Sequence, residues 1–112
     1  MTLDEIEREL LEQLADLEHQ QWIEWAGTIM KQEPISEERR NRWLKLFGSY
    51  KDLSENVKEQ DRKWARKIIK IYRTHIVKLL GRIIEEAYDK DFGTYDYKAI
   101  ADKVISLVKD EK

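Results

Sequence analysis

The chain of 112 residues contains no cysteine, a single proline and four glycines. Without cysteine it can form neither a disulfide bond nor a thiolate metal site. Few glycines and prolines, together with 39% charged residues, are typical of a helical protein rather than a β-sandwich. No stretch shows the strict alternation of a half-buried strand, so we predict an all-α fold.

Long apolar runs are also missing, since no stretch approaches the roughly 20 residues that a helix needs to span a bilayer. The N-terminus, MTLDEIEREL, is acidic and does not have the basic and then apolar order of a signal peptide. We therefore expect a cytoplasmic protein without membrane contact. The length suits one domain, with a helical core over residues 1–73 and an accessory helical pair over residues 74–112.

Charge is spread unevenly along the chain, although the net charge is only −2. Residues 1–30 carry eight acids and one base, whereas residues 31–90 carry sixteen bases and ten acids. Complementarity within the molecule is the simpler interpretation, and a basic surface for an anionic partner is the alternative. Nucleic acid is a poor candidate, because the sequence pI is 5.8 and helical spacing turns Trp64 and Tyr72 toward the core.

Apolar residues at steps of three and four predict four helices. The first is expected over about residues 3–31. Thr2 and Glu5 can form a capping box at its start, and Pro34 disfavours helical geometry after its end. The second is expected over residues 36–47, with a serine as its N-cap and two glutamates in its first turn.

The third helix could extend from residue 54 to residue 88, a length of roughly 50 Å. That exceeds the width of a domain this small. We therefore expect either a break or kink near Thr74 or Gly81, or a second half that packs on other structure. After the turn DKDFG, a last helix is expected to run to about residue 109.

Several ionisable residues occupy positions that helical spacing assigns to apolar faces. On a helical wheel, Glu18 lies within the apolar arc of the first helix and His19 lies at its edge. Asp61 and His75 fall within the apolar arc of the third helix. A buried carboxylate must be paired, hydrogen-bonded or protonated, so we expect cationic partners for Glu18 and Asp61.

The candidate partners are His19, Arg39 on the second helix, and Arg62 beside Asp61. Three interpretations stay open: a structural cluster that fixes how three helices meet, a pocket for a small molecule, or a catalytic carboxylate–histidine pair. No obvious nucleophile or oxyanion hole accompanies these residues, so we expect no enzymatic activity.

The second half of the third helix is apolar over a wide arc. The last helix can cover part of this arc, and a width of this kind often means that a second chain covers the rest. We therefore predict a homo-oligomer, most simply a dimer, or a complex with a protein partner. The candidate interface comprises Ile76, Leu79, Leu80, Ile83, Ile84 and Ala87.

No cofactor or metal is expected. The two histidines lie far apart in the sequence and no cysteine accompanies them, which argues against zinc. The segment DKDFGTYDY places Asp89 and Asp91 at the first and third positions of a calcium loop. However, Gly93 falls one place early, and Ile100 stands where a bidentate glutamate is needed.

Two blocks of sequence carry a resemblance to a known family. One is LEHQQW, with His19 and Trp22, and the other is SYKDLSENVKEQDRKWA, with Tyr50, Asp61 and Arg62. Together they resemble the ryanodine-receptor-type (RyR) domain, a small helical module of calcium-release channels that also occurs in bacteria, archaea and phages. Small phage and prophage versions are the most similar.

The resemblance covers about residues 14–70 and implies a non-catalytic module that binds nucleotide-like ligands or mediates assembly. The channel repeats carry a β-like excursion where this chain has a basic helix, so only the matching positions carry over. Two functions follow, a protein-interaction or assembly domain of phage or prokaryotic origin, which we favour, and a binding module for a small anionic ligand. The candidate ligand site, with arginines for phosphate and tryptophan for stacking, comprises Glu18, His19, Trp22, Arg39, Tyr50, Asp61 and Arg62.

Overall fold

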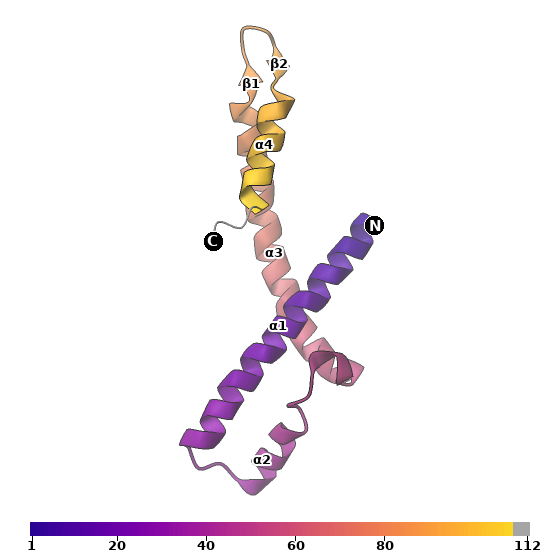
Figure 1. Ribbon diagram of the computed structural model, residues 1–112, viewed down its shortest axis with the longest axis vertical. Coiled ribbons are helices and arrows are strands. Elements are labelled where there is room, and N and C mark those ends of the chain that lie inside the picture. Colours follow the sequence, from indigo (N-terminus) through magenta and orange to yellow (C-terminus); the bar gives the residue numbers. More distant parts are fainter. Residues whose placement is uncertain (109–112) are drawn as a thin grey trace. The chain divides into compact units, whose positions relative to one another are not determined.

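The structure, a computed structural model, describes residues 1–108, so the predicted end of the last helix at residue 109 lies outside it. The predicted all-α class is confirmed, with helices making up most of the described residues (Figure 1). The chain divides into two compact units, Met1–Ile69 and Lys70–Lys112. The elements are α1 (Leu3–Gln32), α2 (Glu37–Leu44), the short 3₁₀ helix η1 (Tyr50–Asp52), α3 (Glu55–Glu86), β1 (Tyr88–Asp89), β2 (Thr94–Tyr95) and α4 (Tyr97–Val108).

The start of α1 is fixed by the predicted capping box. The Glu5 backbone N–H donates to the Thr2 hydroxyl oxygen at 3.1 Å, and the Thr2 N–H donates to the Glu5 carboxylate at 2.9 Å. Both bonds satisfy donors that a helix N-terminus would otherwise leave open. At the other end, Glu33 is extended, as expected for the residue before Pro34.

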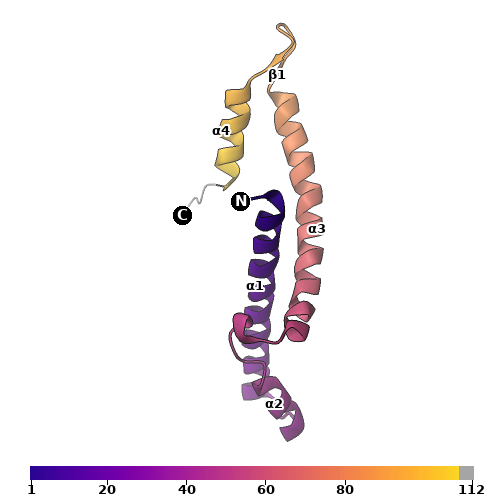
Figure 2. The ribbon, with the colours of Figure 1, turned by 90° about the vertical axis from the view of Figure 1, so that its right-hand side faces the viewer.

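The second helix is shorter than predicted. Ser36 caps it, with its hydroxyl oxygen accepting the backbone N–H of Arg39 at 3.1 Å. The helix ends at Leu44, where tighter bonds replace the α-helical pattern, since the Leu46 N–H donates to the Trp43 carbonyl. The chain then turns toward η1, which lies against α1 (Figure 2).

The core of the first unit lies where α1 crosses the first part of α3 (Figure 1, Figure 2). Ala15 on α1 and Ala65 on α3 are fully buried in one cluster with Tyr50, which is 7% exposed. Alanine methyl groups leave little bulk between the two helices, so their backbones can approach closely. Half-buried leucines surround this crossing, namely Leu11, Leu14 and Leu53.

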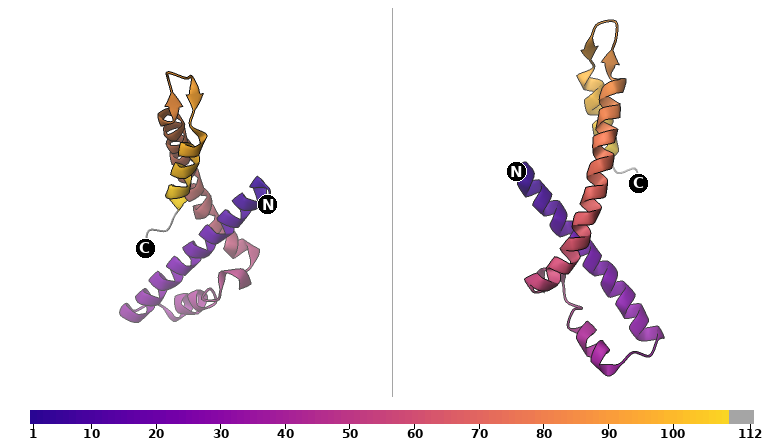
Figure 3. Two further views of the ribbon diagram at one scale, coloured as in Figure 1. Left: turned by 45° about the horizontal axis from the view of Figure 1, so that its top comes forward. Right: turned by 180° about the vertical axis from the view of Figure 1, so that it is seen from behind.

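The third helix runs through Thr74 and Gly81 without interruption. The structure therefore shows the second of the two expectations for its length, because α4 lies beside its last turns (Figure 3). Ile83 is buried there, with 5% of its surface exposed. No helix among residues 1–108 is long and apolar enough to cross a membrane.

A two-stranded antiparallel ladder between α3 and α4 was not predicted. Tyr88 pairs with Tyr95 and Asp89 pairs with Thr94, so α3 ends at Glu86 rather than at residue 88. The tyrosine rings lie 5.0 Å apart between centroids, and aromatic pairs of this kind support a hairpin. Two residues in each strand are too few for strand alternation to show in the sequence.

Local turn chemistry closes this hairpin. The Asp89 carboxylate accepts the backbone N–H groups of Asp91 and Phe92, at 2.9 and 3.3 Å. Gly93 has a φ of 63°, a left-handed conformation that glycine adopts without strain. Asp96 then caps α4 by accepting the N–H of Ala99 at 3.0 Å.

Candidate functional site

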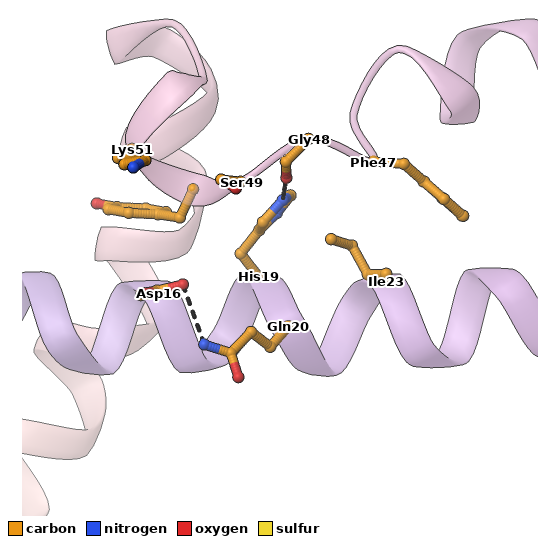
Figure 4. A pocket seen from close by; sticks show the side chains of 9 residues that line it. Asp16, His19, Gln20, Ile23, Phe47, Gly48, Ser49 and Lys51 are labelled. Atoms are coloured by element: carbon orange, nitrogen blue, oxygen red, sulfur yellow. Dashed lines mark hydrogen bonds between the residues drawn. The ribbon is translucent and has the colours of Figure 1, made fainter.

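His19 is the buried polar residue at the centre of the first unit. It lies in the middle of α1 and is 3% exposed. Its Nε2 lies 2.9 Å from the carbonyl oxygen of Gly48, in the segment between α2 and η1 (Figure 4). A carbonyl oxygen only accepts hydrogen bonds, so Nε2 carries the proton. This hydrogen bond links the segment between α2 and η1 to α1.

The other ring nitrogen of His19 faces a carboxylate. Its Nδ1 lies 3.7 Å from Oδ2 of Asp61, whose side chain is 17% exposed. Desolvation raises the pKa of Asp61, the charge of His19 opposes this rise, and the charge of Glu18 adds to it. The pair attracts when the imidazole is protonated, and the helices α1 and α3 are then linked through opposite charges.

A second polar network joins the same elements through Glu12. The Tyr50 hydroxyl donates to Glu12 Oε2 at 2.6 Å, and the Arg62 Nε–H donates to Glu12 Oε1 at 2.7 Å. Arg62 also donates to Glu55 at 2.8 Å. Each oxygen of the Glu12 carboxylate therefore has a charged or phenolic donor, which makes this network a strong link among α1, η1 and α3.

The pKa directions in this network follow from its contacts. Burial alone would raise the pKa of Glu12, but the hydrogen bonds from Tyr50 and Arg62 outweigh it and lower that pKa. Burial, followed by the bond to Glu12, raises the pKa of the Tyr50 hydroxyl. The Arg62 pKa is raised, first by its bond to Glu55 and next by its bond to Glu12, so the guanidinium stays charged.

Aromatic rings surround His19 on its other side. Trp22 lies one turn further along α1 and stacks on the imidazole, with ring centroids 6.3 Å apart and an interplanar angle of 14°. Trp43 and Phe47 meet Trp22 edge to face, at 5.9 and 5.7 Å. These contacts hold the indole in place and leave it half-buried.

Two open grooves border His19. The first, of about 440 Å³, is the candidate ligand site nearest to the prediction, because it places Trp22 and Asp61 beside two cations of α2 and the turn after it. Its lining comprises His19, Trp22, Arg42, Trp43, Lys45, Leu46, Val57, Gln60 and Asp61. The second, of about 460 Å³, opens over the bond between His19 and Gly48 and is bordered by Asp16 and Lys51 (Figure 4).

The predicted cationic partners lie elsewhere, apart from His19. Glu18 is half-exposed, and no ion pair joins Arg39 to Glu18 or Asp61 within residues 1–108. Arg39 is exposed, whereas the next residue, Arg40, turns inward and donates to the Met30 carbonyl at 3.2 Å. Consecutive residues point about 100° apart on a helix, so a shift of one position exchanges the inward and outward arginines.

Arg62 likewise points away from its sequence neighbour, Asp61, and binds glutamates instead. The sequence analysis did not single out Glu12, which was counted only among the acids of residues 1–30. One signal could have found it, since Glu12 precedes His19 by two helical turns and therefore shares its face. No sequence signal identifies the Gly48 carbonyl as a partner of His19, because every residue has a backbone carbonyl.

The predicted positions of two aromatic residues are wrong. Trp64 and Tyr72 are 54% and 61% exposed rather than turned into the core. Ala65 is buried at the crossing of α1 and α3, and Trp64, one position earlier, points about 100° away from it around the helix. The ammonium of Lys67 lies over the Trp64 ring, 4.3 Å from its centroid.

The predicted interface residues fall into two groups. Ile76, Leu79, Leu80 and Ile84 are exposed on α3. Ile83 is buried and Ala87 is half-buried, and both line the contact between α3 and α4. The exposed group is thus free for a contact that the described residues of this unit do not provide.

Fold and site together define an all-α protein with a buried histidine–carboxylate pair. Within residues 1–108, no group of three or more histidine, aspartate or glutamate side chains is placed to hold a metal ion. Comparisons with protein-family models, with curated proteins and with solved structures gave no match.

Proposed function

We propose that this chain is a non-catalytic protein-interaction module. In it, the first unit is the rigid framework, and the hairpin formed by the end of α3, β1, β2 and α4 presents the contact surface. The observation that carries the proposal is the exposure of large apolar side chains on both helices of this hairpin. Between 38% and 60% of each of these side chains is exposed, namely Ile76, Leu79, Leu80, Ile84, Ile105 and Leu107.

Exposure on this scale has a physical cost that contact with a partner removes. Covering the open half of a leucine or isoleucine contributes about 1 kcal/mol, at about 25 cal/mol per Å² of apolar surface. Scattered apolar residues are normal on a protein surface, whereas contiguous patches mark sites of interaction. On α3, Leu79 and Leu80 follow Ile76 by three and four positions and Ile84 follows Leu80 by four, so these side chains form a continuous stripe along that helix.

The geometry of the first unit supports a structural rather than a catalytic role for its polar cluster. Both ring nitrogens of His19 face protein groups, Gly48 on one side and Asp61 on the other. A general base must reach a proton of the substrate, and this imidazole is 3% exposed. The Glu12 carboxylate is similarly occupied by Tyr50 and Arg62.

The proposal is tested by placing a charge on the contact surface. All four tryptophans lie in residues 1–69, so tryptophan fluorescence reports on the framework alone. We expect Leu80→Glu to leave the tryptophan-monitored melting temperature within about 2 °C of the parent, because surface changes usually alter stability by less than about 0.5 kcal/mol. Thr74→Glu, on the polar side of the same helix, is the matched control.

A fall in the tryptophan-monitored melting temperature after Leu80→Glu, but not after Thr74→Glu, would contradict the proposal. It would mean that Leu80 belongs to the chain's own core. Burying a charge there would then cost several kcal/mol, as unpaired buried charges do.

A second candidate function is the binding of a small anionic ligand with an aromatic ring, such as a nucleotide, at the groove beside Trp22. The observation that favours it is the presence of Arg42 and Lys45 next to Trp22 and Trp43 in the lining. Arginine can form bidentate hydrogen bonds to a phosphate, and an indole edge can pack on a base.

A nucleotide at a hundredfold excess over its Kd would raise the stability by about 2.7 kcal/mol. We expect this as a rise in melting temperature that Arg42→Ala and Asp61→Ala abolish. Arg39→Ala, on the same helix but outside the groove, should leave the rise intact. Equal shifts in all three variants, or no shift in the parent, would exclude the groove as the site.

A further inference from the structure

The hairpin from residue 70 to residue 108 consists of one layer of helices. The end of α3 and α4 run antiparallel and are joined by β1 and β2 (Figure 3). Within these residues, Ile83 is the one large apolar side chain that is buried. Stable architectures enclose a core between two layers, so a second layer must cover the open faces of this hairpin.

The spacing of apolar residues on α3 indicates how many other helices can pack against its apolar face. Two overlapping series have steps of four, three and four, the spacing of helices in a bundle core. One series is Tyr72, Ile76, Leu79 and Ile83, and the other is Ile76, Leu80, Ile83 and Ala87. A stripe this wide serves two neighbouring helices, and α4 is only one of them.

The contact with α4 leaves room that the hairpin itself does not fill. An open space of about 240 Å³ lies between the two helices. Its lining comprises Ile83 and Glu86 on α3, Ala87 just after it, and Ala99 and Lys103 on α4. On α4, Ile105 and Leu107 remain 60% and 47% exposed. Both helices therefore keep apolar side chains that the hairpin itself does not cover.

We propose that this layer is the hairpin of a second copy of the chain, so that two hairpins form a four-helix bundle around a two-fold axis. The inference rests on the proposed interaction function and names its partner. An identical hairpin supplies apolar stripes of the same width and length, and two-fold pairing uses the same patch on both chains.

Charge also favours a second copy. Residues 70–108 carry seven bases and six acids, so two hairpins do not repel each other strongly. In this part of α3, the bases Lys70, Arg73 and Lys78 come first, and the last turn carries Glu85 and Glu86, of which Glu86 pairs with Arg82 of the same helix at 3.1 Å. Antiparallel pairing of two α3 helices brings the basic end of one toward the acidic end of the other. A nucleic acid or an acidic partner would lack this match.

The molecular mass in solution is the first test. Sedimentation equilibrium over a wide range of concentrations should give twice the mass of the chain. Leu80→Glu should halve the mass, whereas Thr74→Glu, which adds the same charge on the polar side, should leave a dimer. A monomeric parent, or a dimer that survives Leu80→Glu unchanged, would overturn the second-copy proposal.

A thiol probe separates failure of this proposal from failure of the proposed function. The chain has no cysteine, so Leu80→Cys and Thr74→Cys each introduce a single thiol. In the dimer, the thiol at position 80 should react with a small reagent at least about tenfold more slowly than the thiol at position 74.

The other two outcomes are equally decisive. A monomer whose two thiols react equally fast overturns the second-copy proposal but leaves an exposed contact surface for another protein. A monomer in which the thiol at position 80 is protected overturns both, because the chain would then cover this surface itself.

Discussion

Two carboxylates in the first unit lie close to the same helices and have opposite electrostatic roles. Glu12 is held charged by donors from Tyr50 and Arg62, which lower its pKa against the effect of burial. Asp61 has its pKa raised by desolvation, and His19 only partly offsets the loss of solvent. The charge on Glu12 therefore stabilises the fold, whereas the charge on Asp61 weakens it.

This difference predicts a pH dependence for Asp61→Asn. Because the folded pKa of Asp61 is raised, the folded state holds the proton more tightly than the unfolded state does. Stability is then lost as pH rises through the folded pKa. We expect Asp61→Asn to be more stable than the parent at neutral pH and to lose this advantage below about pH 4, where both states are protonated. Urea unfolding across this range measures the difference.

Glu12→Gln should behave in the opposite way, which makes it the matched comparison. The lowered pKa of Glu12 contributes stability that is present above the unfolded pKa and is lost as pH falls through the folded one. Glu12→Gln should therefore cost most at neutral pH and least in acid. Parallel pH profiles for the two variants would show that neither assignment of charge is right.

At the residue scale, helical spacing predicted which side of each helix faces inward, but not which residues of other helices the inward side chains contact. Helical spacing placed His19 and Asp61 inward, and they do meet, because a wheel reports direction around one axis. It does not report which residue of another helix lies at the same height. That is why Arg62 was paired with Asp61 in the sequence and binds Glu12 in the structure.

At the scale of elements, the crossing of α1 and α3 depends on the small size of Ala15 and Ala65. We expect Ala65→Leu to destabilise the first unit by about 1–3 kcal/mol, since added methyl groups in a packed site force the helices apart. The tryptophan-monitored free energy of unfolding measures this. Ala101→Leu, on the exposed surface of α4, is the control and should leave that value unchanged.

The helices and their starts were largely predictable, because capping is a local interaction. Thr2 with Glu5, and Ser36 with the N–H three residues later, are close in the sequence and in space. The ladder of β1 and β2 could not be predicted, because it depends on both the left-handed conformation of Gly93 and the hydrogen bonds of the Asp89 side chain. The apolar stripe on α3 was visible as a pattern, but the same spacing serves a core and an interface.

For the whole molecule, self-association predicts that thermal stability depends on protein concentration. A folded dimer is favoured by mass action, so the melting temperature followed by far-ultraviolet circular dichroism should rise as the chain is concentrated. In Leu80→Glu the same measurement should give one temperature at every concentration. A constant melting temperature in the parent would contradict association through the hairpin.

The hydrogen bonds that link distant parts of the first unit have a consequence for how this unit folds during synthesis. The Tyr50 and Arg62 side chains reach Glu12 across 38 and 50 positions of sequence. A ribosome releases the chain from its N-terminus, so α1 emerges long before the groups that neutralise its inner carboxylate. Helix formation takes microseconds or less, whereas closing such long loops waits for synthesis. The nascent helix must therefore stay solvated on that face, which the acids along α1 favour, until Arg62 emerges and the unit closes in one cooperative step.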